Sequence, residues 1–107
     1  MIQEHEIVLY QVEGTNICVN VVFKDETFWM TQKAMAELFD VNVPAISKHL
    51  SNIFEEGELF KEATVSKMEI VQMEGNRKVK REPEFYNLDA IIAVGYRVNS
   101  KKATRFR

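Results

Sequence analysis

The stretch that decides the fold spans residues 31–54 and reads TQKAMAELFDVNVPAISKHLSNIF. Two short amphipathic helical patterns follow each other here, separated by a break of about three residues. In the first pattern the apolar residues recur at helical spacing between Met35 and Phe39. The second pattern shows the i, i+4, i+7, i+8 stripe of a helix that buries one face. This stripe consists of Ile46, Leu50, Ile53 and Phe54.

The ends of both helical patterns carry the residues that helix ends require. Thr31 and Asn42 can each cap a helix, because a side-chain oxygen accepts a hydrogen bond from an orphan N–H of the first turn. Pro44 falls in the first turn of the second helix, where its missing N–H costs nothing. Asp40 stands in the turn where glycine is frequent, and Asp tolerates the left-handed backbone better than most residues. The sequence therefore predicts two helices joined by a tight turn.

The spacing of Ala36, Val41 and Ile46 indicates a DNA-reading helix-turn-helix, in which a small residue lets the helices cross closely. An ordinary helical hairpin is the open alternative, since consecutive amphipathic helices are common. In the helix-turn-helix interpretation the second helix, from residue 43 to about 54, lies in the major groove. The side chains expected to contact DNA here are Thr31, Gln32, Asn42, Val43, Pro44, Ala45, Ser47, Lys48 and Ser51.

The charge of the chain is unevenly distributed. The 107 residues carry a net charge of −2, with 46% apolar and 28% charged residues, as in an ordinary globular domain. Residues 1–66 hold 4 Lys and Arg against 11 Asp and Glu, a net charge of −7. Residues 67–107 hold 10 against 5, a net charge of +5. An acidic half joined to a basic half suggests one face that meets an anion.

Strand-like patterns flank the helical stretch on both sides. Residues 2–30 are expected to form a small supporting antiparallel sheet, because residues 16–23 alternate with a period of two. Residues 65–86 predict a β-hairpin with its turn at 73–76, and residues 87–98 predict a mostly buried C-terminal helix capped by Asn87. Pro83 lacks an N–H donor, which places it at a sheet edge or a bulge.

The return strand of the predicted hairpin is strongly basic. Arg77, Lys78, Lys80 and Arg81 are the candidates for phosphate contacts, in the manner of the wing of a winged helix. The alternative is an edge strand that is protected from aggregation by its charge.

Several other kinds of chemistry are not expected. His5 and His49 are far apart and the chain has one cysteine, so no metal site is predicted. We recognise no Gly-rich phosphate loop and no nucleophile motif, and therefore expect neither an enzyme nor a cofactor or small-molecule ligand. No apolar run approaches the roughly 20 residues of a membrane span, and no signal peptide is recognised. The lone Cys18, expected to be buried, fits a reducing cytoplasm.

Several blocks of the sequence resemble a known family. They are Phe28-Trp29-Met30-Thr31-Gln32, Ile46-Ser47-Lys48-His49-Leu50, Phe85-Tyr86-Asn87-Leu88-Asp89 and Gly95-Tyr96-Arg97-Val98-Asn99-Ser100-Lys101. With these blocks the chain is similar to the N-terminal domain of the RhuM family of bacterial virulence-associated proteins. Family members continue beyond residue 107, so the resemblance implies the N-terminal part of a longer protein. Its similarity to phage antirepressor-like domains implies nucleic-acid binding, with transcription regulation in a virulence or mobile-element context.

Together these patterns predict an α+β fold, as a single domain over residues 1–107. We expect a winged helix-turn-helix with a small N-terminal antiparallel sheet and a basic β-hairpin wing. The expected function is binding of duplex DNA, by a homodimer, in the cytoplasm. The rival interpretation is a protein-interaction or dimerisation module on the same scaffold. The small, weakly charged start of the second helix, Val43-Pro44-Ala45, favours this rival, and it offers no arginine for guanine recognition.

Overall fold

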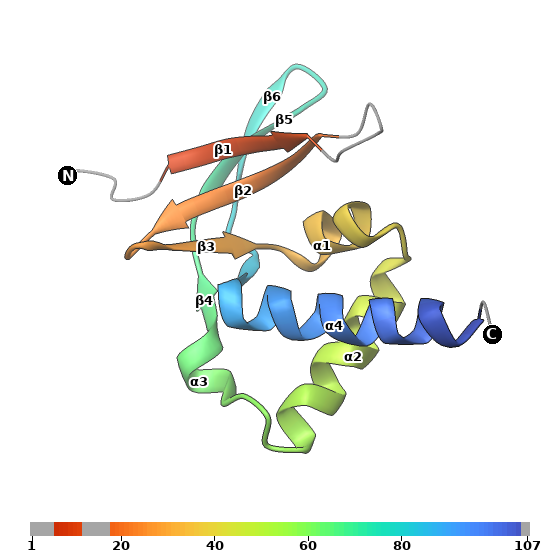
Figure 1. The fold of residues 1–107 in the computed structure, drawn as a ribbon. Helices are drawn as coiled ribbons and strands as arrows, with labels where there is room; N and C mark the ends of the chain where they lie inside the picture. The colour runs from red at the N-terminus through yellow and green to blue at the C-terminus, as the bar shows by residue number, and fades with distance from the viewer. Residues whose placement is uncertain (1–5, 12–17, 106–107) are drawn as a thin grey trace.

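The computed structural model describes residues 6–11 and 18–105. Within these residues the chain forms a five-stranded antiparallel sheet of order β1-β2-β3-β7-β4, a separate two-stranded sheet β5-β6, and four helices (Figure 1). The strands are β1 (Glu6–Gln11), β2 (Cys18–Lys24), β3 (Thr27–Met30), β4 (Val65–Lys67), β5 (Ile70–Glu74), β6 (Arg77–Arg81) and β7 (Glu84–Asn87). The helices are α1 (Gln32–Phe39), α2 (Val43–Glu55), α3 (Lys61–Thr64) and α4 (Leu88–Arg105). The α+β class is thus confirmed. Residues 2–5 and 12–17 of the predicted sheet lie outside the described residues.

The stretch at residues 31–54 folds as its capping residues predict. The Ala34 N–H donates to Thr31 Oγ1 at 3.1 Å, and the Ala45 N–H donates to Asn42 Oδ1 at 2.8 Å. Asp40 ends α1 in the left-handed region, with φ 57° and ψ 49°. The turn between α1 and α2 is therefore closed by local hydrogen bonds and one left-handed residue.

The core lies between the helices and one face of the sheet. From β2 the buried residues are Val19 and Val21, from α1 Ala34, Met35 and Ala36, from α2 Ile46, Leu50 and Ile53, and from α4 Ala90, Ile91, Ala93, Val94 and Val98. The predicted apolar stripe of the second helix is buried at Ile46, Leu50 and Ile53, whereas Phe54 is half-buried. A second, smaller cluster of Val22, Trp29, Met68 and Phe85 packs separately.

The predicted hairpin at 65–86 is divided into two paired segments. β4 pairs with β7 inside the five-stranded sheet, whereas β5 pairs only with β6. Between the segments the Met68 N–H donates to the Pro83 carbonyl oxygen at 3.4 Å. Because Pro83 has no N–H to return, the ladder is interrupted at this point. The β5-β6 ribbon therefore leaves the sheet and projects from the body (Figure 1).

Two details differ from the expectations. Helix α4 continues to Arg105 instead of ending at residue 98, because the polar residues that follow Val98 are compatible with a helix. Cys18 is exposed, since it opens β2 on the side opposite the buried Val19. No helix within the described residues is both long and apolar enough to cross a membrane.

Helix α4 passes close to α1 at Gly95. A Cβ added to Gly95 would lie 3.0 Å from Cε1 and Cζ of Phe39. Gly95 is buried, although glycine in a helix interior costs roughly 1 kcal/mol relative to alanine. The close approach of the Phe39 ring explains why the position has no side chain.

We predict that Gly95→Leu lowers the free energy of unfolding by about 1–3 kcal/mol, because the added side chain overpacks the contact with Phe39. Urea denaturation monitored by Trp29 fluorescence measures the change. The double variant Gly95→Leu/Phe39→Ala should recover part of the loss. An equal or larger loss in the double variant would contradict the assigned contact.

Candidate nucleic-acid interface

Helix α2 presents one face to solvent near its N-terminus. It buries Ile46, Leu50 and Ile53 on the opposite side. The exposed members of the predicted contact set are Asn42, Val43, Pro44, Ser47, Lys48 and Ser51, and Ala45 is half-buried. The structure thus brings these seven residues together on the α2 segment. Lys48 is the only lysine of α2, which contains no arginine.

Thr31 and Gln32 occupy a different position, at the start of α1. Thr31 Oγ1 accepts the capping hydrogen bond from Ala34. Gln32 Nε2 donates to the hydroxyl of Tyr86 at 3.0 Å, and that hydroxyl donates to Glu84 Oε1 at 3.3 Å. Their side chains are therefore engaged within the fold, and a DNA contact for either stays a prediction.

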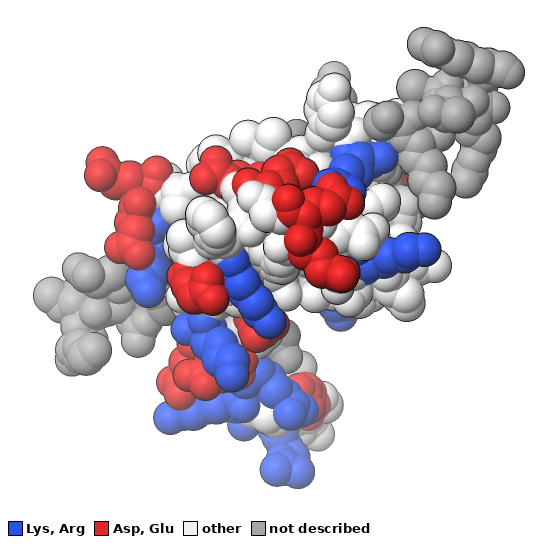
Figure 2. Space-filling view, turned by 90° about the horizontal axis from the view of Figure 1, so that it is seen from below, with Lys and Arg blue, Asp and Glu red and all other residues white. Residues whose placement is uncertain are grey.

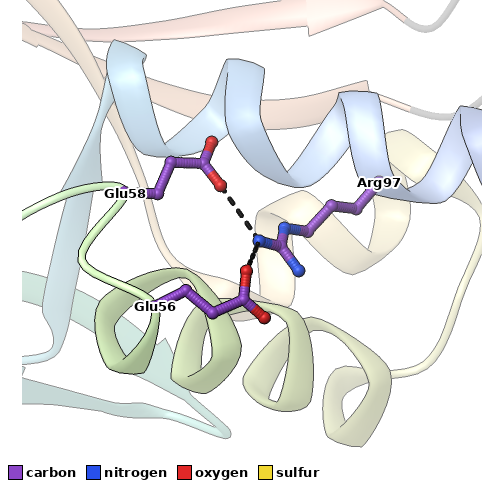
Figure 3. A network of polar contacts seen from close by, with 3 residues as sticks. All are labelled: Glu56, Glu58 and Arg97. Atoms are coloured by element: carbon purple, nitrogen blue, oxygen red, sulfur yellow. Dashed lines mark hydrogen bonds and ion pairs between the residues drawn. The ribbon is translucent and has the colours of Figure 1, made fainter.

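An open groove of about 590 Å³ separates α2 from α4. Lys48, His49 and Asn52 line it from α2, and Tyr96 and Arg97 line it from α4. At its end Arg97 Nη2 contacts Glu56 Oε1 at 2.8 Å and Glu58 Oε1 at 3.0 Å (Figure 3). These hydrogen bonds, first that with Glu56 and then that with Glu58, raise the pKa of Arg97. One guanidinium thus ties α4 to the end of α2.

Arg97 is not among the site residues predicted from the sequence. Its partners lie 39 and 41 positions away along the chain, so no local spacing reveals the pairing. The signal that was present is the carboxylate cluster of Glu55, Glu56 and Glu58, which needs a cation to compensate it.

The β5-β6 ribbon divides the four predicted phosphate contacts between its two faces. Cross-strand partners share a face, and the register pairs Val71 with Lys80 and Met73 with Lys78. All four of these side chains are exposed. Within the described residues, no ion pair involves either lysine.

The other face of the ribbon carries the two arginines. Arg81 Nε and Nη2 donate to the Glu74 carboxylate at 3.0 and 2.8 Å, and Arg77 lies directly across from Glu74. Hydrogen bonding to Arg81 lowers the pKa of Glu74. Lys78 and Lys80 are therefore better placed than Arg81 to neutralise an external phosphate.

The ribbon and α2 lie at different ends of the molecule. In Figure 1 the ribbon extends past β1 at the top, whereas α2 lies below α4. Seen from below, acidic side chains gather over the body, and basic side chains gather on the projecting lobe (Figure 2). The positive charge of the C-terminal half is thus carried largely away from α2.

Comparison with known proteins relates the C-terminal part of the chain to one family. Residues 63–107 match the model of the Virulence protein RhuM family. The predicted resemblance is confirmed over this RhuM segment, which contains the β4–β7 hairpin and α4. Helices α1 and α2 precede it. No curated protein and no solved structure matches the chain.

The described residues contain no group of three or more His, Cys, Asp or Glu side chains placed to hold a metal ion. The candidate interface consists of the exposed face of α2 and the lysine face of the ribbon, which we define as Val71, Met73, Lys78 and Lys80.

The buried Tyr86 hydroxyl gives a pH-dependent contribution to stability. Burial raises the pKa of Tyr86, against the opposing effect of the Gln32 hydrogen bond. Because the folded pKa exceeds the unfolded value of about 10, this contribution is complete below about pH 10 and is lost as the pH rises through the folded value. We predict that Tyr86→Phe flattens the alkaline fall of stability, measured by urea denaturation between neutral and alkaline pH. Parallel curves for the two proteins would contradict this assignment.

Proposed function

We propose that this domain binds duplex DNA, with the N-terminal half of α2 in the major groove. The observation that supports the proposal best is the geometry of the α1–α2 unit. A left-handed Asp40 and the Asn42 cap start α2 tightly after α1, and the first turns of α2 remain exposed. In helix-turn-helix proteins the second helix likewise follows a tight turn, and its N-terminal residues contact base edges.

The exposed side chains of α2 suit a DNA groove chemically. Lys48 would pair with a guanine edge or a phosphate, and Ser47 and Ser51 would donate to phosphates. Val43 and Ala45 would contact thymine methyl groups. The positive end of the α2 dipole adds to the attraction for phosphate.

The lysine face of the ribbon would supply a further electrostatic contact. In this proposal the domain is a winged helix whose wing is the β5-β6 ribbon, and Lys78 and Lys80 neutralise phosphates. Because α2 carries a single lysine, we assign most of the sequence-independent affinity for DNA to the ribbon. A role in transcription regulation belongs to the same proposal.

The α2 contact is tested by fluorescence anisotropy with random duplex DNA at several salt concentrations. Lys48→Ala should weaken binding and reduce the slope of log affinity against log salt by about 0.9, the value of one phosphate contact. Lys61→Ala is the matched control, since Lys61 is also an exposed helical lysine but lies on α3. Equal effects of the two variants, or no binding by the unmodified domain at about 50 mM salt, would overturn the proposal.

The ribbon contact is tested by a pair of adjacent substitutions. Lys80→Gln and Arg81→Gln each remove one positive charge, on opposite faces of β6. We predict that Lys80→Gln reduces the salt slope by about 0.9, whereas Arg81→Gln changes it less, because Arg81 is engaged by Glu74. The same titration measures both variants. A larger loss with Arg81→Gln would assign the contact to the other face.

A protein-interaction module is the second candidate function. The observation favouring it is the sparse positive charge of α2, together with the exposure of its Val43 and Pro44. If the domain fails to bind DNA at low salt, this candidate replaces the first.

A further inference from the structure

Helix α4 has an uncovered apolar face. Its buried side consists of Ala90, Ile91, Ala93, Val94 and Val98. On the outward side Leu88, Ile92 and Tyr96 are 38%, 60% and 78% exposed. Residues spaced by four lie in one row on a helix, and this row extends for about 12 Å. We call these three residues the α4 row.

The size of the α4 row is relevant to an interface. The row contains one aromatic residue, Tyr96, and an aromatic side chain buries roughly 150–250 Å² when it is covered. Together with the exposed parts of Leu88 and Ile92, the row presents on the order of 400 Å² of surface. A standard interface buries about 800 Å² per partner. The row would thus form the apolar centre of such an interface, with the exposed Asp89 and Asn99 at its margin.

We propose that the α4 row is the contact surface for a second copy of this chain. Ile92 lies four residues from both Leu88 and Tyr96, so the row is symmetric about it. A two-fold axis at Ile92, with the two α4 helices antiparallel, sets Leu88 of each copy against Tyr96 of the other. Every member of the row then has an apolar partner.

The charges around the row agree with this pairing. The row itself contains no charged residue, so two identical copies meet without repulsion along it. Asp89 has no ion pair within the described residues. In the antiparallel arrangement Asp89 of one copy falls level with residue 95 of the other. The two Asp89 carboxylates are therefore about 9 Å apart along the helix axis and do not face each other.

The arrangement also places α2 suitably for DNA, a point that rests on the proposed function. Figure 1 shows α2 extending below α4, and Tyr96 and Arg97 line the groove between the two helices, so α2 lies beside the row. A two-fold axis that is perpendicular to α4 and lies in the interface reverses the helix direction and keeps both α2 helices on the same side. Both copies would then face the same side, as two half-sites require.

Sedimentation equilibrium of the domain without DNA, from micromolar to millimolar concentration, tests the proposal. We expect the mass to rise from 12.5 kDa toward twice that value. Ile92→Asp should raise the dimer dissociation constant at least about tenfold. Val71→Asp is the matched control and should leave it unchanged, because Val71 is 58% exposed but lies on the ribbon. Circular dichroism verifies folding, and Tyr96→Lys serves as the second variant if Ile92→Asp does not fold.

A disulfide experiment tests the two-fold axis itself. In a Cys18→Ser background, Ile92→Cys should cross-link to its own counterpart on oxidation, whereas Val71→Cys should not. A mass of 12.5 kDa at every concentration, or a dimer unaffected by both row variants, would overturn the proposal. A dimer that does not bind DNA would refute the proposed function and leave the dimer standing. A monomer that binds DNA would refute the dimer and leave the proposed function standing.

Discussion

The position of α2 depends on the close passage of α4 across α1. Gly95 permits this passage, since any side chain there would meet the ring of Phe39. Ala90 and Ala93 are also small and buried, in the same apolar cluster as the buried residues of α1 and α2. Helix α2 packs one face into this cluster, and its opposite face is exposed. The ion pairs of Arg97 connect α4 to the end of α2, but exposed ion pairs contribute little to the free energy of folding. The apolar packing between the helices therefore determines the position of α2.

The local features of the fold were predictable from the sequence, and the long-range ones were not. Thr31 and Asn42 act through bonds to residues three positions away, so the sequence reveals both caps. The neighbours β3 and β7, by contrast, are separated by the whole helical region, and no local pattern specifies their pairing. The same limit applies to the candidate site. The exposed face of α2 follows from its helical period, whereas the partners of Arg97 depend on how α4 packs.

The ribbon shows why a charge count is a coarse guide to binding. By composition Arg77, Lys78, Lys80 and Arg81 are equivalent cations, but the pairing register assigns them to two faces. Glu74 occupies the arginine face, which leaves the lysines beside exposed apolar side chains. In the proposed function, phosphate attraction and base contact would therefore lie on separate elements, the first on the ribbon and the second on α2.

The interruption of the ladder between Met68 and Pro83 has a consequence for the dynamics of the domain. Below it the cluster of Val22, Trp29, Met68 and Phe85 anchors the hairpin to the sheet. Beyond it the ribbon is a two-stranded sheet without a third strand, an arrangement that is only marginally stable by itself. The backbone amides of β5 and β6 should therefore exchange with solvent through local opening, whereas the amides of the buried segments of α1, α2 and α4 should exchange only on global unfolding. The domain thus combines a rigid body with an appendage that opens and closes independently.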